Sequence, residues 1–429
     1  MRLADHRPSS YTERWLPDGR LQLAQQRIVK IETLCISHLL LLRVHTDQGL
    51  IGCGETYYAP QAVAAMLHDW MSNRLIGANA LDIEKHWRFF YERFINFGGR
   101  GVELRAISAI DLALWDIFGQ SCKLPIWQLL GGRTRESVPA YCSPGGTSYG
   151  INTDNDGPEF LGWPGHGSAG FEGPLEDNWS IIHRAGEYAE ELLKEGFPAV
   201  KAWALDPLAH RSGGPLHLTW RELRKALQPL FDIRDRVGYD IEIMLDGHGF
   251  FQWPAALRVA EVMREIKPLW IEDVLRVDNI DTLKEFRDQA GVPVAVTEMF
   301  TTREDFRHVL EKRAADYVMV DPTWVGGISE TKRIVDMAIP YNIPVAMHDC
   351  TGPFTLLAGV HVGTACPNVV FQETVRAHLR IVYQKLIDQE LTVHEGTITP
   401  PDRFGIGAAW LPHLFSKDQA FYRVTEEDG

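Results

Sequence analysis

The sequence lacks long hydrophobic runs and has few cysteines. Its six cysteines form no Cys-x-x-Cys pair and no spacing typical of a metal site: Cys35, Cys53, Cys122, Cys142, Cys350 and Cys366. In a chain of 429 residues this pattern favours a reduced, cytoplasmic protein whose thiols are small buried apolar groups. No apolar run approaches membrane-spanning length, and residues 1–15 contain no apolar segment typical of a signal peptide.

Positive charge is also scarce. The chain carries 43 Lys and Arg against 57 Asp and Glu, a formal net charge of −14. This balance argues against a general binder of nucleic acid or of anionic membranes, although it leaves room for a local positive pocket for a small anion. We therefore expect a small-molecule partner.

The hydrophobic pattern divides the chain near residue 135. Residues 27–57 have the branched residues and turn signals of strands, and residues 60–130 have helical spacing, which is clearest at 102–120. These segments predict an α+β module. After Ser137, apolar strands alternate with helical segments: VPAYC, AVKAW, IEIML, PLWIE, PVAVTE, YVMVD, IPVAMHD and NVVFQE. Such alternation is typical of parallel βαβ units.

Polar residues end six of these strands at regular intervals. They are Asp246, Glu272, Glu298, Asp321, His348 and Glu373, separated by 26, 26, 23, 27 and 25 residues. Each interval fits one strand, one loop and one helix, so eight units predict a (β/α)₈ barrel with its functional residues at the carboxyl ends of the strands. An open doubly wound sheet is the alternative, but it needs no functional residue at six successive strand ends.

One long glycine-rich segment, 143–177, follows the first of these strands. Loops of this length are usually functional or disordered. It is either a lid or pocket wall over the barrel mouth, or a mobile or oligomer-contact loop.

Three carboxylates are expected to converge, because Asp246, Glu272 and Glu298 end consecutive strands. Three like charges repel unless a cation is present, and oxygen-only ligands suit a hard ion such as Mg²⁺. Helix caps and surface salt bridges are the ordinary alternative for any one of them.

His348 and Asp321 end neighbouring strands and predict a general acid/base dyad, because an aspartate fixes the tautomer of a histidine and stabilises its charged form. Glu373 ends the eighth strand. We expect it to donate a hydrogen bond in its protonated form, or else to pair with Arg376.

The motifs resemble the mandelate racemase subgroup of the enolase superfamily over residues 27–410. The matching segments are ISAIDLALWDIFGQ with PIWQLLGG, LDGHG, WIEDV, VTE, VDPTWVGGISE, VAMHD and PPDRFGIG. The resemblance implies a modified TIM-type (β/α) barrel with an α+β capping domain. It also implies one Mg²⁺ per subunit on Asp246, Glu272 and Glu298, the His348–Asp321 dyad, and an electrophilic role for Glu373 near the substrate carboxylate.

The corresponding division is a capping domain at 1–135, a barrel at 136–385, and a C-terminal segment at 386–429 that packs on the cap. The resemblance further suggests a homo-oligomer, either a dimer or an octamer.

The sequence departs from the racemase pattern at the second barrel strand. Racemases of this subgroup carry Lys-x-Lys there, whereas AVKAWAL keeps Lys201 and has Trp203 in place of the second lysine. An indole cannot abstract a proton, so racemisation by two bases with a lysine is not expected. Lys201 either binds substrate or balances the carboxylates. We expect Trp203 to shape the pocket and Trp324, in VDPTWVGGISE, to contact the substrate.

His248 stands two residues after Asp246, so the two side chains share a face if the strand continues. A second-shell or turn histidine is the alternative. With a histidine at this position, the sequence resembles the galactonate- and mannonate-type dehydratases of the subgroup, which carry a histidine at the same place.

The resulting hypothesis is a Mg²⁺-dependent sugar-acid dehydratase. His348 removes the proton α to the carboxylate, His248 protonates the departing 3-hydroxyl, and a 2-keto-3-deoxy acid results. Which histidine performs which step, whether elimination is syn or anti, and which sugar acid is the substrate remain open. The alternatives are a racemase or epimerase of a 2-hydroxy acid, a non-catalytic sugar-acid binder, and a Zn²⁺ hydrolase, for which the expected His-x-His at the first strand end is missing.

Overall fold

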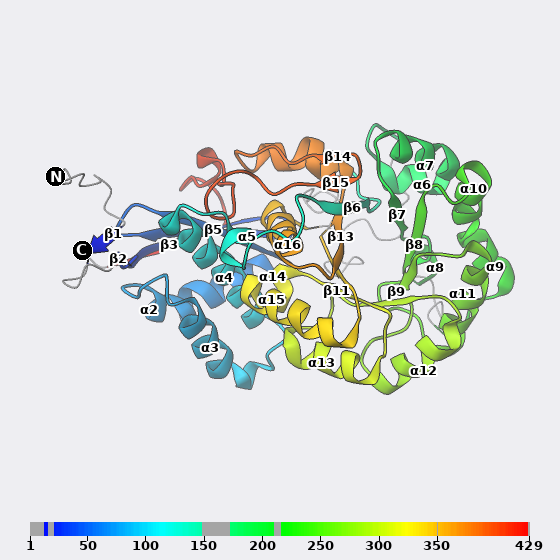
Figure 1. Cartoon of the computed structure of the whole chain (residues 1–429), viewed down its shortest axis with the longest axis horizontal. Coiled ribbons are helices and arrows are strands. Elements are labelled where there is room, and N and C mark those ends of the chain that lie inside the picture. Colours follow the sequence, from blue (N-terminus) through cyan, green and yellow to red (C-terminus); the bar gives the residue numbers. More distant parts are fainter. Residues whose placement is uncertain (1–12, 16–20, 148–171, 210–215, 350, 428–429) are drawn as a thin grey trace, which may run out of the picture.

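The computed structural model describes residues 13–15, 21–147, 172–209, 216–349 and 351–427. It contains a barrel and an N-terminal module that packs beside it (Figure 1). Most of the predicted loop at 143–177 lies outside the described residues.

The N-terminal module is built on a four-stranded antiparallel sheet in the order β16-β3-β4-β5. Its strands are β3 (Ile28–Ile36), β4 (Leu39–Thr46), β5 (Ile51–Tyr57) and β16 (Tyr422–Glu426). β16 comes from the end of the chain and pairs with β3, with Val424 opposite Glu32. The C-terminal segment therefore packs on this sheet, while the boundaries at residues 135 and 385 stay a prediction.

Helices cover one side of this sheet. They are α1 (Pro60–Ala65), the π-helical η1 (Met66–Met71), α2 (Ser72–Leu75), α3 (Ile83–Arg93) and α4 (Val102–Cys122). The short helix α5 (Ile126–Leu129) follows α4, and its Ile126 packs into the apolar core shared with the barrel. The long helix α4 lies directly against β5. A Cβ atom at Gly52 or Gly54 would stand 2.1 Å from the carbonyl oxygen of Ala113 or Ala109, so glycine permits this close approach of helix to strand.

The barrel closes through eight parallel strands, because β13 pairs with β6. The strands are β6 (Val138–Cys142), β7 (Ala199–Ala202), β8 (Glu242–Asp246), β9 (Trp270–Glu272), β10 (Val294–Val296), β11 (Tyr317–Val320), β12 (Val345–Met347) and β13 (Val369–Thr374). The eight strands predicted from the sequence are confirmed, and the open-sheet alternative is wrong. The structure is a modified TIM-type barrel with an α+β capping domain.

The barrel helices alternate with these strands and surround them (Figure 1). They are α6 (Asp177–His183), α7 (Ala185–Lys194), α8 (Asp206–Ala209), α9 (Trp220–Ala226), α10 (Gln228–Val237), α11 (Trp253–Ile266), α12 (Ile280–Ala290), α13 (Thr302–Lys312), α14 (Pro322–Val325), α15 (Gly327–Ala338) and α16 (Pro353–Ala365).

A separate apolar cluster is formed by one residue from each of seven barrel strands: Tyr141, Ala199, Met244, Trp270, Ala295, Met319 and Ala346. Large and small side chains share this layer, as expected where strands converge on a narrow interior. Trp270 lies two residues before Glu272 on the same strand, and its indole N–H donates to Glu272 Oε2 at 3.0 Å. The cluster therefore supports the polar residues at the strand ends.

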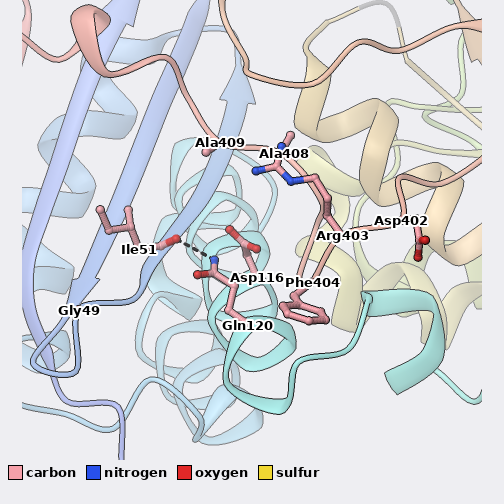
Figure 2. A pocket seen from close by; sticks show the side chains of 9 residues that line it. All are labelled: Gly49, Ile51, Asp116, Gln120, Asp402, Arg403, Phe404, Ala408 and Ala409. Atoms are coloured by element: carbon pink, nitrogen blue, oxygen red, sulfur yellow. Dashed lines mark hydrogen bonds between the residues drawn. The ribbon is translucent and has the colours of Figure 1, made fainter. Parts of the chain in front are cut away.

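The C-terminal segment is held to the cap by buried polar contacts. Asp116 of α4 accepts hydrogen bonds from the backbone N–H groups of Cys53 at 2.9 Å and Ile406 at 3.0 Å. Figure 2 shows Asp116 in a pocket of about 570 Å³ between α4 and residues 402–409, where Gln120 donates to the carbonyl of Ile51. None of the polar residues at the barrel strand ends lines this pocket.

In the described segments, no helix combines the length and the apolar character needed to cross a membrane. The five described cysteines are free thiols, four of them buried, as the sequence predicts.

The contact between α4 and β5 predicts the effect of Gly54→Ala. We expect the substitution to lower the free energy of unfolding by about 2–3 kcal/mol, because the new methyl group meets backbone that cannot rotate away. Gly101→Ala is the matched control, since its nearest neighbour is the flexible side chain of Glu103, and should cost less than about 1 kcal/mol. Equal losses in urea unfolding would contradict this account of the packing.

Candidate active site

The six polar residues predicted at the strand ends gather at the carboxyl end of the barrel. Asp246 and Glu272 are the last residues of β8 and β9 and stand opposite each other in register. Glu298 lies two residues beyond β10, Asp321 and His348 directly follow β11 and β12, and Glu373 is in β13. All six are buried, none being more than 4% exposed. Their environment therefore amplifies every charge–charge interaction among them.

The ammonium group of Lys201 lies among three of these carboxylates. Its Nζ is 2.8 Å from Glu373 Oε1 and 3.1 Å from both Asp246 Oδ2 and Glu272 Oε1. Burial lowers the pKa of Lys201, but the three carboxylates outweigh burial and the pKa is raised well above its usual value. Of the two roles expected for Lys201, these contacts favour balancing the carboxylates.

The anions still outnumber this cation. Burial first, and then Asp246 and Glu298, raise the pKa of Glu272 to about 8 even though Lys201 opposes them. Burial and the Glu298 charge raise the pKa of neighbouring Asp273 well above its usual value. Within the described chain, the buried Glu298 Oε2 has no hydrogen-bond partner. An unpartnered buried carboxylate oxygen beside other carboxylates fits a hard divalent cation in charge and donor chemistry.

The described side chains are not arranged around a metal ion as they stand. No group of three or more His, Cys, Asp and Glu residues among them is close enough to hold one. Lys201 instead lies between Asp246 and Glu272. The Mg²⁺ site on Asp246, Glu272 and Glu298 therefore stays a prediction that the donor set supports.

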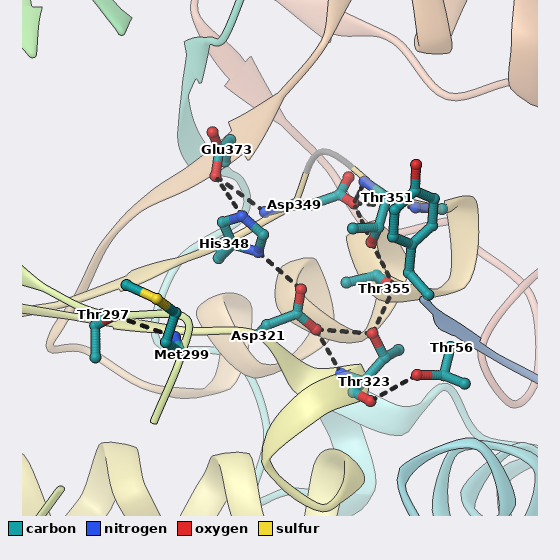
Figure 3. A network of polar contacts seen from close by, with 12 residues as sticks. Thr56, Thr297, Met299, Asp321, Thr323, His348, Asp349, Thr351, Thr355 and Glu373 are labelled. Carbon is teal, nitrogen blue, oxygen red and sulfur yellow. Dashed lines mark hydrogen bonds and ion pairs between the residues drawn. The ribbon is translucent and has the colours of Figure 1, made fainter. Parts of the chain in front are cut away.

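The predicted contact between His348 and Asp321 is present. His348 Nδ1 is 2.7 Å from Asp321 Oδ2, while Asp321 Oδ1 accepts from the N–H and hydroxyl of Thr323, both at 2.7 Å (Figure 3). An ionised carboxylate only accepts, so Nδ1 carries the proton in this contact. His348 Nε2 then faces Glu373 Oε2 at 3.8 Å and is the nitrogen placed to exchange a proton.

A line of hydroxyl groups runs from this dyad to the capping domain. Thr323 Oγ1 is 3.2 Å from Thr355 Oγ1, which lies 2.7 Å from Glu55 Oε1 of strand β5. Burial raises the pKa of Glu55 to about 8 against the opposing effect of the Thr355 bonds. Each hydroxyl has one proton to donate. Thr355 Oγ1 donates to Glu55 Oε1 and Thr323 Oγ1 donates to Asp321 Oδ1, so the two hydroxyl groups link a carboxyl group of the cap to the dyad.

The contacts of Glu373 match neither role predicted for it. It accepts hydrogen bonds from the hydroxyl of Ser143 and from the Asp349 N–H, the latter at 3.1 Å. Burial raises the pKa of Glu373, but Lys201 and His348 lower it by more than burial raises it, so the pKa lies below its usual value. In these contacts Glu373 accepts, which does not favour the expected protonated donor, and that role stays a prediction. Pairing with Arg376 is wrong, because Arg376 binds Asp177 instead.

His248 reaches the site through a turn. The strand ends at Asp246, and His248 has a φ of 49° with its N–H donating to Asp246 Oδ1 at 2.9 Å. The strand therefore does not continue to His248, which lies in a turn, as the alternative from the sequence has it. The turn nevertheless returns the ring to the site, where Nε2 lies 3.5 Å from Asp246 Oδ2.

A second aspartate–histidine pair was not predicted from the sequence. His248 Nδ1 is 3.0 Å from Oδ1 of Asp206, a buried residue that opens α8 just after strand β7. Burial lowers the pKa of His248, but Asp206 and Asp246 raise it to about 9. The only sequence signal was an aspartate shortly after a barrel strand, in ALDP, and nothing in the spacing tied it to His248.

Aromatic side chains line both histidines. The ring of Trp203 is 5.6 Å from that of His248, and the ring of Trp324 is 5.1 Å from that of His348. Trp324 also meets Tyr58 of the capping domain, at 5.6 Å between ring centroids. The position of Trp203 is compatible with its expected pocket-shaping role, and the expected contact of Trp324 with the substrate stays a prediction. The cap contributes Tyr58 to the same region.

Together these residues can do acid/base chemistry on a carboxylate-bearing molecule. β8 and β12 are the third and seventh of eight strands, so the two aspartate–histidine pairs stand on opposite sides of the barrel mouth. The carboxylate cluster with Lys201 lies on the strands between them and beside them. A substrate at the mouth would therefore meet one histidine on each side.

Two family models match the chain. Residues 23–131 match the N-terminal domain of the mandelate racemase / muconate lactonizing enzyme family, and residues 184–413 match the enolase C-terminal domain-like family. Among curated relatives, D-xylonate dehydratase from Haloferax volcanii is 28% identical over 370 residues, which are 86% of this chain and 82% of that protein. Arabinonate dehydratase from Saccharolobus solfataricus is 26% identical over 86% of this chain and 87% of its own length.

Solved structures show the same relationship. An enolase protein from Sargasso Sea environmental sequencing is 33% identical, with a TM-score of 0.81 over 94% of this chain and 100% of that one. An enolase of the mandelate racemase subgroup from Agrobacterium tumefaciens, with a succinimide residue, is 31% identical, with a TM-score of 0.79 over 93% of this chain and 99% of that one.

The raised pKa of Glu55 predicts a pH-dependent stability. The fold favours the neutral form of Glu55. The stabilisation that this form gives to the folded state is complete below the ordinary pKa of 4.5 and is lost as the pH rises through about 8. Glu55→Gln cannot ionise, and its free energy of unfolding should rise relative to wild type between pH 5 and pH 8 in urea titrations. Glu55→Ala should lose about 1–3 kcal/mol, because it removes the acceptor of the Thr355 N–H.

Glu92→Gln, at an exposed position on α3, is the control, and its free energy of unfolding should depend on pH in the same way as that of wild type. If the free energy of unfolding of Glu55→Gln also follows that of wild type between pH 5 and pH 8, the raised pKa assigned to Glu55 is wrong.

Proposed function

The chain belongs to the mandelate racemase subgroup of the enolase superfamily, and on that premise we propose that it is a Mg²⁺-dependent dehydratase of a sugar acid. The dehydratase names of several relatives support the reaction class. The observation that carries the proposal is the pair of buried histidines on opposite sides of the barrel mouth, each bonded to an aspartate.

His348 is the proposed base. Its Nδ1 is held by Asp321, which leaves Nε2 to take the proton from the carbon next to the substrate carboxylate. Asp321 stabilises the imidazolium that forms, and the Thr323 bonds hold Asp321 in position. Glu373 lies beside Nε2 and favours the charged histidine as well.

His248 is the proposed acid. Breaking the bond between C3 and its hydroxyl requires a proton on the departing oxygen, since hydroxide is a poor leaving group. His248 is bonded to Asp206 in a way that favours its charged form, and it stands across the mouth from His348. The arrangement suits loss of the proton and the hydroxyl from opposite faces. One water leaves, and the enol product tautomerises to a 2-keto-3-deoxy acid.

Asp246, Glu272 and Glu298 are the proposed ligands of Mg²⁺. A divalent cation bound there supplies Lewis-acid stabilisation of the negative charge that develops on the substrate carboxylate. Lys201 contributes a second positive charge to the same region. The surrounding residues are fully buried, so water does not screen these charges.

A racemase or epimerase remains the second candidate, because two opposed histidines also suit proton removal on one face and return on the other. Trp203 in place of a lysine removes only the lysine-dependent version of that reaction. The predictions of a cytoplasmic location, a dimer or octamer, and a small-molecule partner without nucleic acid or membrane binding accompany the proposed function.

The two histidine roles predict different results for two variants. With a screened library of mono- and diacid sugars and Mg²⁺ in D₂O, His348→Asn should lose both dehydration and deuterium exchange at the α carbon, by about 10³-fold or more. His248→Asn should lose dehydration by a similar factor but keep the exchange, because the base is intact. NMR of the recovered acid and a keto-acid assay measure the two steps.

His308→Asn on the exposed face of α13 is the control and should behave as wild type. Wild-type exchange with full retention of the 3-hydroxyl would support the racemase or epimerase instead. Undiminished turnover in His348→Asn would refute the base assignment.

Metal removal tests the carboxylate site. Protein treated with EDTA should lose turnover, and added Mg²⁺ should restore it. Calorimetric titration should show about one Mg²⁺ per subunit for wild type and at least about 10-fold weaker binding for Glu298→Gln. Glu304→Gln, on the surface of α13, is the control. Full activity in EDTA, or equal Mg²⁺ binding by Glu298→Gln, would contradict the proposed site.

A further inference from the structure

Arg105 extends from the capping domain to the edge of the proposed active site. It lies in the first turn of α4, and its Nη1 donates to the carbonyl of Tyr57 at 2.9 Å. Its guanidinium lies 4.4 Å from the ring centroid of Trp324 and 5.5 Å from that of Tyr58. Because Trp324 packs against His348, a single aromatic ring separates Arg105 from the proposed base.

This guanidinium has no carboxylate partner. Among the described residues Arg105 forms no ion pair, and its bond to the Tyr57 carbonyl is its single hydrogen bond. Burial lowers its pKa to about 10 although the Asp321 charge opposes this, so Arg105 stays charged at neutral pH. Asp321 forms no ion pair with Arg105 among the described residues, and its oxygens accept from Thr323 and His348.

Arg376, which is buried, shows the usual arrangement of an arginine with anionic partners. It binds Asp177 through two nitrogens and Glu195 through a third. Arg105 is only half-buried, and its charge is met by the rings of Trp324 and Tyr58 rather than by a carboxylate. Its remaining donors can therefore still bind an anion.

A second donor near Arg105 also lacks an acceptor. The indole Nε1 of Trp324 is buried and has no hydrogen-bond partner within the described chain. The guanidinium and this N–H belong to two side chains in contact. Two adjacent donors, one half-buried and one buried, suit a ligand with two oxygens, and guanidinium in particular matches a carboxylate.

The loop that follows strand β5, and that accepts the Arg105 hydrogen bond, has an unusual backbone conformation. Tyr58 and Ala59 both have positive φ, 68° and 48°, directly after strand β5. Non-glycine residues adopt this region at a cost, and two in succession need support from their surroundings. The Arg105 bond to the Tyr57 carbonyl and the contact of Tyr58 with Trp324 supply that support.

We propose that Arg105 and Trp324 form an anion subsite for the second carboxylate of a dianionic sugar acid, so that the preferred substrate is an aldarate. The inference rests on the proposed function, because it assumes that the first carboxylate binds near Lys201 and the carboxylate cluster. His348 contacts both regions, through Glu373 on Nε2 and through Trp324 on its ring. An aldonate ends in a neutral hydroxymethyl group, which leaves the Arg105 charge uncompensated, whereas an aldarate compensates it.

The test compares a six-carbon aldonate with the aldarate of the same configuration at C2 to C5. For wild type, kcat/KM should be roughly 10- to 100-fold higher for the aldarate. Arg105→Met keeps most of the apolar stem but loses the bond to the Tyr57 carbonyl, so it should lower kcat/KM for both acids, and by roughly 10-fold more for the aldarate than for the aldonate. Arg105→Lys should recover part of the preference, because it keeps the charge but not the paired donors.

Arg88→Met, on the exposed face of α3, is the matched control and should keep the wild-type preference. Calorimetric binding of both acids to each variant separates this inference from the proposed function. Tighter aldarate binding that depends on Arg105, with no dehydration of either acid, would uphold the subsite and refute the dehydratase. Dehydration with equal preference for both acids, or equal losses for both in Arg105→Met, would refute the subsite and leave the dehydratase standing.

Discussion

The site depends on one electrostatic constraint, which is the burial of several carboxylates at the carboxyl end of the barrel strands. Asp246, Glu272 and Glu373 share the ammonium of Lys201, and the excess charge is visible in the raised pKa of Glu272. Such a cluster is stable only with cations close by, because the protein interior does not screen like charges. The need for positive charge here gives Lys201 its position and makes the carboxylates suitable ligands for a divalent ion.

The capping domain is joined to this site by polar and aromatic contacts. Glu55 of β5 binds the N–H and hydroxyl of Thr355 at the start of α16, and Thr56 donates to the Thr323 carbonyl next to the dyad. Tyr58 packs on Trp324. The cap therefore helps to position the His348–Asp321 dyad, since the groups that orient Asp321 are themselves oriented by strand β5. Its close contact with α4, made possible by Gly52 and Gly54, sets the position of that strand.

The order of the barrel strands and the residues at their ends could be predicted because they follow local rules. A strand, a loop and a helix need about 25 residues, and parallel strands bring their carboxyl ends to one edge. Asp206 and Arg105 could not be predicted in this way. Asp206 belongs to a short helix after β7, and it meets His248 across 42 residues of sequence. Arg105 lies on a cap helix more than 200 residues from Trp324, so no spacing rule connects them.

The sequence alone determined the barrel, the six polar strand ends and the family, because hydrophobic periodicity and motif order are local properties of the chain. The tertiary structure decided the protonation and partners of those residues. His248, expected on a continuing strand, is carried by a turn and paired with Asp206. Glu373, expected as a protonated donor, accepts from Ser143 and Asp349 and pairs with Lys201. Both outcomes follow from the charges that surround a group in three dimensions, which the order of residues along one strand does not specify.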